Sequence, residues 1–317
     1  MEERKQVIVV LTNEGINSYI GGLGTYIQEI RKRLSYSNQF IIHFYEIPFD
    51  QGYLEDTSYD SRLAHLIGAA DIVHANDYYT GYVALLRLSR AKLITAIHLL
   101  NNWWYPYYWR TDDFWLTHEH KRHMEKTVLS KSHRLIAVSN FIKEELQLLG
   151  VVRDKIDVIH NGAGDSFFLH PHKEERNNEI ILGICGRLVK QKGSEMIPRL
   201  AAQLNTLSFP WRLEIIGDGP YRPLIEETIN MLELKDHCHL LGWQDNHELP
   251  GIYTRWDVTL SLTHYEPFGI APLESLATGT PIFGSIVCGM REYCVEGVNS
   301  LASTTTSVQG LVDRLAS

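Results

Sequence analysis

Residues 264–274 read His264-Tyr-Glu-Pro-Phe-Gly-Ile-Ala-Pro-Leu-Glu274 and follow the apolar run 257–262. The run predicts a buried strand, and Pro272 suits the first turn of a helix, where its missing N–H is not needed. A strand that leads into a helix in this way leaves free backbone amides at the helix N-terminus, which can hold a phosphate. Glu266 lies before the helix and Glu274 within it, so one carboxylate can reach a sugar hydroxyl while the other reaches a ribose. The stretch predicts a phosphate and sugar site at the carboxyl edge of a sheet.

Strand and helix signals alternate on both sides of this stretch. The expected strands are 7–11, 40–45, 71–74, 92–98, 134–138, 155–159, 179–185, 212–216, 237–241, 257–262 and 281–283. The expected helices are 25–34, 64–70, 82–88, 119–130, 141–149, 195–204, 222–232, 248–255, 272–277 and 308–315. Alternation of this kind predicts right-handed βαβ units and parallel sheets.

The alternation is interrupted by a polar segment in the middle of the chain. The segment is rich in Gly, Pro, His and charged residues and has little apolar periodicity. We therefore predict an α/β protein with two Rossmann-like domains, residues 1–162 and 179–317, joined by a linker at 163–178. We expect the parallel sheets of the two domains to face a cleft that holds the ligand.

Composition and charge argue against nucleic-acid and membrane partners. Hydrophobic residues make up 44% and charged residues 21% of the 317 residues, as in ordinary globular proteins. The formal net charge is −8. Nucleic acid and anionic lipid are bound by clustered cations, so we expect no nucleic-acid partner and at most weak peripheral membrane contact. The four cysteines form no CxxC pair, and no apolar run has the length of a signal peptide or membrane helix, so we expect a cytoplasmic protein.

Two glycine clusters follow expected strands and precede expected helices. The first is Gly21-Gly22-Leu23-Gly24, where the backbone can approach a phosphate closely; a flexible turn is the alternative. It matches neither GxGxxG nor a P-loop. The second is Gly186-Arg-Leu-Val-Lys-Gln-Lys-Gly193, which places two candidate phosphate ligands, Arg187 and Lys192, between glycines. Cations in such a loop suit a diphosphate.

An aromatic stretch spans residues 98–115 without helical or strand periodicity. Trp103, Trp104 and Tyr105 lie in it and could form a platform for a sugar acceptor. A loop packed on the core, a protein interface and a membrane-edge contact remain the alternatives. Three nearby histidines, at 118, 120 and 123, have no matching carboxylate or cysteine frame, so we interpret them as a solvated helix face rather than a metal site.

The motifs together resemble those of a known enzyme family. The sequence Glu266-Pro-Phe-Gly-Ile-Ala-Pro-Leu-Glu274, followed by Ala277-Thr-Gly-Thr-Pro281, is similar to the signature of the retaining glycosyltransferases of family 4, which have the GT-B fold. Further landmarks of that family occur in order, and they are Asn161-Gly162, Gly186-Arg-Leu188, Lys192-Gly193, Gly217-Asp-Gly-Pro220, Leu241-Gly-Trp243, Glu292 and Glu296-Gly-Val-Asn299. The resemblance covers nearly the whole chain and is strongest over 155–301.

The resemblance implies a role for each matching residue. Arg187 and Lys192 would neutralise the donor diphosphate, and Glu274 would bind the donor ribose. Glu266 would contact the donor sugar near its 3-hydroxyl and stabilise positive charge at the anomeric carbon. Further donor contacts would come from the backbone, namely the amides of Phe268, Gly269 and Ile270 at the sugar or phosphate and the backbone near Leu241 and Gly242 at the base.

The first half more loosely resembles the bacterial glycogen and starch synthases. Gly21 and Gly22 would lie on the phosphate side of the donor, and His98 ends a T-x-H strand, Thr95-Ala-Ile-His98, so that it would hold the donor sugar or the transition state. The segment His74-Ala-Asn-Asp-Tyr-Tyr-Thr-Gly81 is similar to H-A-H-D-W-H-x-G. It differs at Asn76 and Tyr79, where that branch has histidines.

The resemblance implies a specific reaction. A hexose, which we expect to be glucose, would move from a UDP-sugar to a hydroxyl of a carbohydrate or small-molecule acceptor with retention of configuration, in polysaccharide or cell-envelope glycan synthesis. No D-x-D sequence occurs, and fixed cations can stabilise the leaving diphosphate, so we expect no cofactor and no metal. The chain stops at Ser317 soon after the last expected helix, so we expect the C-terminal domain to lack the usual C-terminal helices.

Other protein classes fit parts of the pattern. An NAD-type oxidoreductase would bind a nucleotide between two such domains, but the GxGxxG sequence with its acidic residue is missing. A sugar-nucleotide epimerase would lack the Glu-Pro-Phe-Gly frame. A non-catalytic carbohydrate-binding protein would use the aromatic stretch alone.

Overall fold

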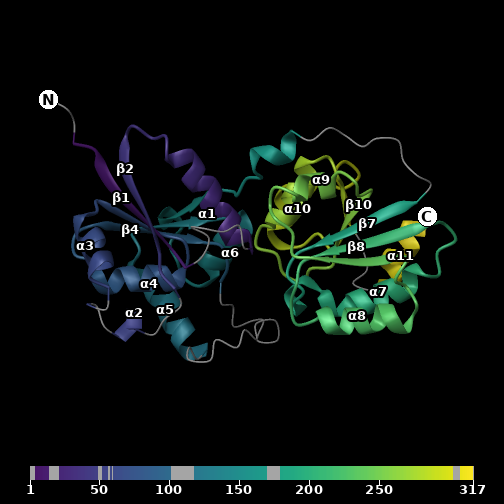
Figure 1. The fold of residues 1–317 in the computed structure, drawn as a ribbon. Coiled ribbons are helices and arrows are strands. Elements are labelled where there is room, and N and C mark those ends of the chain that lie inside the picture. Colours follow the sequence, from purple (N-terminus) through teal and green to yellow (C-terminus); the bar gives the residue numbers. More distant parts are fainter. Residues whose placement is uncertain are drawn as a thin grey trace. The chain divides into compact units, whose positions relative to one another are not determined.

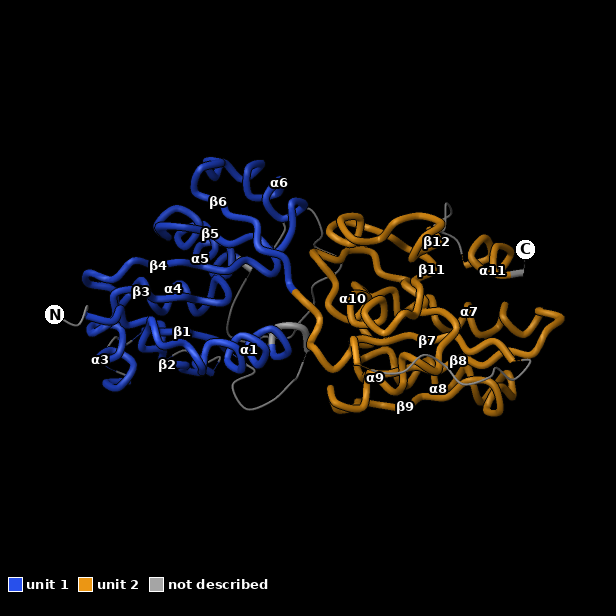
Figure 2. The backbone as a smooth tube through the Cα atoms, turned by 90° about the horizontal axis from the view of Figure 1, so that it is seen from above, with its two compact units in different colours: residues 1–161 blue, residues 162–317 orange. Residues whose placement is uncertain are grey.

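The chain forms two compact units, residues 1–161 and 162–317, each with its own parallel sheet (Figure 2). The computed structural model describes residues 4–13, 21–48, 52–55, 58, 60–100, 118–169, 179–302 and 308–316. Each sheet has six strands, and its strand pairs are parallel. The predicted fold class, two Rossmann-like α/β domains, is confirmed.

Unit 1 has the strand order β2-β1-β3-β4-β5-β6 (Figure 2). Its strands are β1 (Gln6–Thr12), β2 (Phe40–Glu46), β3 (Ile72–Ala75), β4 (Lys92–Ile97), β5 (Arg134–Ala137) and β6 (Ile156–Val158). Its helices are α1 (Gly21–Leu34), α2 (Gly52–Glu55), α3 (Ser61–Ala69), α4 (Tyr78–Arg87), α5 (His118–Lys131) and α6 (Asn140–Leu148), with a 3-10 turn, η1, at Arg153–Lys155.

Strand periodicity assigns the two faces of this sheet. Val9 and Val73 are completely buried and pack in one apolar cluster with Leu63 of α3 and Val83 of α4. Side chains one residue further along point to the opposite face. His74, which pairs in register with Val10, lies on that second face. His74 is therefore turned away from the apolar cluster that contains Val9 and Val73.

Unit 2 has the strand order β12-β11-β10-β7-β8-β9. Its strands are β7 (Ile180–Cys185), β8 (Trp211–Ile216), β9 (Cys238–Gly242), β10 (Val258–Ser261), β11 (Ile282–Gly284) and β12 (Ser300–Ala302). Its helices are α7 (Ile197–Leu204), α8 (Arg222–Met231), α9 (Leu249–Tyr253), α10 (Ile270–Ala277) and α11 (Val308–Ala316). The 3-10 turns are η2 (Asp165–Phe168), η3 (Lys190–Lys192), η4 (Ser194–Met196) and η5 (Cys288–Glu292).

The helices of unit 2 cover both faces of its sheet, with α7 and α8 on one and α9 and α10 on the other (Figure 1). On the second face Trp256 is completely buried, and its ring fills the space above Gly183, where an added Cβ would lie 1.9 Å from it. Phe167 of η2 packs in the same cluster, with its ring centroid 6.1 Å from that of Tyr253. Residues 165–168 of the predicted linker therefore pack with unit 2.

Helix α1 begins earlier than predicted. The sequence placed residues 21–24 in a turn before a helix at 25–34, whereas these glycines form the first turn of α1. Gly24 is buried there. Glycine is a weak helix former, so the pattern favoured a loop. In the described part of the chain, no helix combines the length and the apolar character that a bilayer crossing requires.

Candidate functional site

Loops at the carboxyl edge of the unit 2 sheet pack closely against one another, with their backbones in contact at glycines. Gly217, after β8, has φ 121°, and an added Cβ would lie 1.9 Å from the carbonyl oxygen of Gly186, after β7. Gly193 has φ 71°, and its Cβ would lie 2.0 Å from the carbonyl oxygen of Leu262, after β10. Only glycine fits such contacts and dihedral angles. The two predicted motifs, 186–193 and 264–274, therefore lie against each other.

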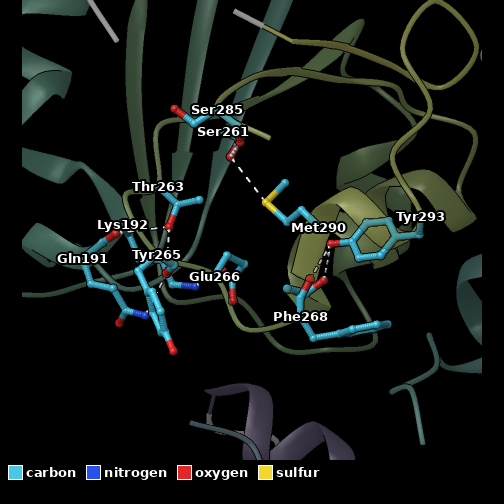
Figure 3. Close-up of polar contacts among 11 residues, drawn as sticks. Gln191, Lys192, Ser261, Thr263, Tyr265, Glu266, Phe268, Ser285, Met290 and Tyr293 are labelled. Atoms are coloured by element: carbon cyan, nitrogen blue, oxygen red, sulfur yellow. Dashed lines mark hydrogen bonds and ion pairs between the residues drawn. The ribbon is translucent and has the colours of Figure 1, made fainter. Parts of the chain in front are cut away.

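Side chains strengthen this junction (Figure 3). The amide of Gln191 donates a hydrogen bond to the carbonyl oxygen of Tyr265 at 3.0 Å. The Thr263 hydroxyl donates to the carbonyl oxygen of Gln191 at 3.1 Å. Between them, the Lys192 ammonium forms an ion pair with the Glu266 carboxylate. Two of the predicted catalytic residues are thus in direct contact.

The charges of this cluster are unevenly buried. Glu266 is 7% exposed, and Lys192 is the cation that pairs with its carboxylate. Arg187 is exposed on the same loop as Lys192, and its guanidinium makes no hydrogen bond or ion pair to any residue that the structure describes. A buried carboxylate needs a partner, whereas an exposed arginine keeps its full capacity to bind an anion. Arg187 is therefore the cation of this loop that is available for a ligand, because Lys192 is already paired with Glu266.

The start of α10 adds backbone donors. Gly269 is its N-cap residue, with φ 91° and no side-chain cap. The N–H groups of Gly269 and Ile270 make no hydrogen bond within the described part of the chain. Helix N-termini of this kind attract anions through both their free N–H groups and the helix dipole. The predicted contact residues Phe268, Gly269 and Ile270 therefore lie beside the Lys192–Glu266 pair.

Glu274 lies one turn further along α10 and is 3% exposed. Its negative charge contributes to raising the pKa of Cys185 at the end of β7 and the pKa of Tyr253 of α9. Burial, with a smaller contribution from Glu274, raises the pKa of the Cys185 thiol to about 12. That thiol therefore stays protonated at neutral pH.

The backbone predicted to meet the base is already engaged. The carbonyl oxygen of Leu241 accepts a hydrogen bond from the Gln244 amide at 2.7 Å. The carbonyl oxygen of Gly242 accepts one from the N–H of Gly217 at 2.8 Å. These bonds fix the end of β9 against the loop after β8. Trp243, next to them, leaves its ring half exposed.

His98 lies at the end of β4 in unit 1. Its ring meets that of Tyr26 on α1 edge to face, with centroids 4.5 Å apart. Its Nε2 atom is buried and has no hydrogen-bond partner among the described residues. Burial, and secondarily the nearby His74, lowers the pKa of His98 to about 3. The predicted sugar-binding histidine is therefore neutral, with one ring nitrogen unused.

The segment that departs from the synthase pattern is largely structural. Asn76 is completely buried, and its Oδ1 lies 3.0 Å from Nε2 of His74. Asp77 caps α4 through a reciprocal capping box with Thr80. The hydroxyl of the buried Tyr79 donates to the carbonyl oxygen of Pro48 at 3.0 Å. Tyr79, where the synthases have histidine, is thus a core residue.

The remaining predicted site residues belong to the start of α1 and to residues 103–105. Gly21 and Gly22 are the first residues of α1, and the acceptor candidates Trp103, Trp104 and Tyr105 lie outside the described residues. The described part of the chain holds no group of three His, Cys, Asp or Glu side chains suited to a metal ion.

The structure also shows residues that sequence reasoning missed. Tyr293 donates its hydroxyl to the carbonyl oxygens of Phe268, at 2.8 Å, and Gly269, at 2.9 Å (Figure 3). The N–H of Gly289 donates to the carbonyl oxygen of Glu266 at 3.1 Å. The only signal in the sequence was the position of Tyr293 directly after the landmark Glu292, and nothing marked a tyrosine hydroxyl as a backbone anchor.

Comparison with known proteins gives the family. Residues 165–317 match the model of the glycosyl transferases group 1, and residues 27–166 match that of glycosyltransferase family 4. A glycosyltransferase of Methanocaldococcus jannaschii, itself uncharacterized, is 29% identical over 78% of this chain and 66% of its own. A glycogen synthase of Mycobacterium tuberculosis is 25% identical over 76% of this chain and 58% of its own. The chain thus spans less than two thirds of the length of these relatives.

Solved structures give the same fold. HepE of Anabaena, in complex with UDP and glucose, is similar over 98% of this chain and 89% of its own, with a TM-score of 0.76 and 18% identity. The two Rossmann-like units, each with a six-stranded parallel sheet, have the GT-B fold of these neighbours. The chain belongs to family 4 of the glycosyltransferases, and the two family matches together account for residues 27–317.

Proposed function

We propose that the protein is a retaining glycosyltransferase that transfers glucose from UDP-glucose to the hydroxyl of a carbohydrate acceptor, in polysaccharide or cell-envelope glycan synthesis. The observation that carries the proposal is the cluster in unit 2, where Lys192 pairs with the buried carboxylate of Glu266, the free amides at the start of α10 lie beside Glu266, and Arg187 is exposed on the same loop as Lys192. A cluster of cations and amides with one carboxylate suits a ligand that has a diphosphate next to a sugar.

The donor identity is supported by relatives. The HepE structure contains UDP and glucose, and one relative is named a glycogen synthase. The family likewise supports transfer chemistry over hydride transfer or epimerisation, the two alternatives that a nucleotide-binding fold alone would leave open.

In the proposed reaction the bond between the anomeric carbon and the diphosphate breaks while the acceptor oxygen bonds to the same face of that carbon. Arg187 and Lys192 stabilise the negative charge that develops on the leaving diphosphate. A leaving oxygen takes the proton of the acceptor hydroxyl, so charge and atoms balance. Glu266 stabilises positive charge at the anomeric carbon, and Glu274 binds the ribose.

The chain supplies its own positive charge at the diphosphate. Two cationic side chains and the N-terminus of α10 fill the role that a divalent cation has in other transferases. We therefore expect transfer to continue in excess EDTA, with Mg²⁺ addition as the comparison. Loss of transfer in EDTA and its recovery with Mg²⁺ would show that the protein cations are insufficient.

Titration calorimetry with UDP, GDP, ADP and their glucose conjugates tests the donor. We expect UDP and UDP-glucose to bind most tightly, and NMR of the product to show the anomeric configuration of the donor.

Arg187→Ala should lower the affinity for UDP by at least about tenfold, the effect of one charge-assisted bond. Lys235→Ala, an exposed cation before β9 at the opposite edge of the sheet, is the matched control. Wild-type protein that binds none of these nucleotides would overturn the proposal, and binding without transfer or donor hydrolysis would leave a carbohydrate-binding protein.

A further inference from the structure

The segment that follows β11 is fastened to the loop that carries Glu266. An added Cβ on Gly289 of η5 would lie 1.9 Å from the carbonyl oxygen of Pro267, so the two backbones are in contact. The N–H of Gly289 donates to the carbonyl oxygen of Glu266. Residues 288–293 thus form a support on one side of residues 266–269.

Tyr293 completes this support. Its hydroxyl lies 2.8 Å from the carbonyl oxygen of Phe268 and 2.9 Å from that of Gly269, and its ring centroid lies 5.2 Å from that of Phe268 (Figure 3). The hydroxyl has one proton, which the two carbonyl oxygens share. Burial, with smaller contributions from Cys294 and Glu266, raises the pKa of Tyr293, so the hydroxyl stays a donor at neutral pH.

The two carbonyl groups determine where the adjoining amides point. In a trans peptide the C=O of one residue and the N–H of the next lie in one plane and point in opposite directions. The carbonyl oxygens of Phe268 and Gly269 point at Tyr293, so the N–H groups of Gly269 and Ile270 point away from it. These are the N–H groups that have no partner within the described part of the chain.

We propose that Tyr293 is a positioning residue of the donor site, whose hydroxyl holds two consecutive peptide planes so that the N–H groups of Gly269 and Ile270 face an oxygen of the donor diphosphate. The inference rests on the proposed function and adds to it the group that orients those amides. An anion is the ligand that two adjacent free N–H groups at a helix N-terminus favour. Gly269 contributes its left-handed backbone, φ 91°, which tilts the first plane against the second.

Pre-orientation explains why one hydroxyl should matter. A peptide plane that must rotate to meet the ligand loses part of the binding free energy to ordering, whereas a fixed plane does not. Tyr293→Phe keeps the ring packing and removes only the shared proton. The carbonyl oxygens of Phe268 and Gly269 then have no hydroxyl donor. The two peptide planes can therefore rotate, and the amides of Gly269 and Ile270 lose their fixed direction.

The test compares Tyr293→Phe with Thr278→Val in the full chain. Thr278 is buried at the other end of α10, where its hydroxyl donates to the carbonyl oxygen of Ser275 at 2.7 Å, so its removal costs a similar hydrogen bond away from the amides. Titration calorimetry measures UDP, ligand-observed NMR measures uridine, and urea unfolding measures stability. We expect Tyr293→Phe to weaken UDP roughly tenfold, the size of one hydrogen bond, and to leave uridine unchanged. Thr278→Val should leave both affinities unchanged.

Amide NMR gives a direct readout. UDP should shift the amide signals of Gly269 and Ile270 in wild-type protein, and this shift should shrink in Tyr293→Phe at saturating UDP. Unchanged UDP affinity in Tyr293→Phe, or equal losses for UDP and uridine, would overturn the inference while the proposed function stands. A wild-type protein that binds neither UDP nor another nucleoside diphosphate would instead overturn the proposed function.

Discussion

Glu266 illustrates how one residue serves two partners. Its buried carboxylate pairs with Lys192, and the same lysine is a proposed ligand of the donor diphosphate. In the proposed reaction the diphosphate therefore competes with this carboxylate for Lys192. Removal of the carboxylate leaves the lysine charge without its partner, which favours an incoming anion.

This competition predicts opposite effects on binding and on turnover. Glu266→Gln should lower the transfer rate by about a hundredfold, the usual scale for one electrostatic group at a reacting centre. UDP affinity should stay equal or rise by a few fold, because Lys192 no longer has a carboxylate partner. Single-turnover kinetics and calorimetry on the same preparation measure the two quantities. A parallel loss of UDP affinity would contradict the assignment of Glu266 to the sugar.

Because of His98, we expect the free energy of unfolding of unit 1 to decrease in acid. Its pKa falls from 6.5 in the unfolded chain to about 3, through burial and the nearby His74. Below pH 6.5 the His98 ring takes up a proton in the unfolded chain but stays neutral in the native one. The contribution of His98 to the free energy of unfolding is therefore fully present above pH 6.5. It is lost as the pH decreases toward 3, by at most about 1.4 kcal/mol per pH unit. His98→Phe should flatten this slope and also remove a buried unpaired Nε2.

Hydrogen exchange of the strands β3 and β4 between pH 7 and pH 5 follows the stability of unit 1. The exposed His65 of α3 provides the control variant, His65→Phe, whose slope should equal that of the wild type. A slope in His98→Phe as steep as that of the wild type would show that other groups, such as the buried His74, carry the acid sensitivity.

At the scale of elements, the strand–loop–helix units were predictable and the supports between them were not. The strand at 7–11 became Gln6–Thr12 and the last helix at 308–315 became Val308–Ala316, because apolar periodicity is strong there. The short strand β12 and the turn η5 have little periodicity, so neither was predicted. Motifs located Lys192 and Glu266, but contact between their side chains depends on Gly193 meeting Leu262, which only the folded chain reveals.

The loop after β8 should tolerate no side chain at Gly217. Gly217→Ala places a Cβ 1.9 Å from the carbonyl oxygen of Gly186 on a backbone with φ 121°. We expect a loss of about 2–4 kcal/mol in the free energy of unfolding of unit 2, measured by urea denaturation. Gly251→Ala in α9, where nothing lies within 4 Å, is the control and should be neutral or stabilising. Equal stability of the two variants would mean that the loops after β7 and β8 are not in contact.

At the scale of the whole molecule, each unit has its own sheet and apolar core, so each can respond to a ligand separately. The residues proposed to bind the diphosphate, Arg187, Lys192 and the start of α10, all belong to unit 2. A ligand that binds only the native form of one unit stabilises that unit by mass action, by about 2.7 kcal/mol at a hundred times its Kd.

UDP should therefore slow hydrogen exchange in the slowest amides of β7, β8 and β10 and leave those of β1, β3 and β4 unchanged. In Arg187→Ala the same protection should need at least about tenfold more UDP, because one charge-assisted bond to the diphosphate is lost. Lys235→Ala should behave as the wild type. The outcome that would contradict this picture is protection of the β1, β3 and β4 amides alone, because the nucleotide would then be bound by unit 1 and the cationic loop of unit 2 would need another ligand.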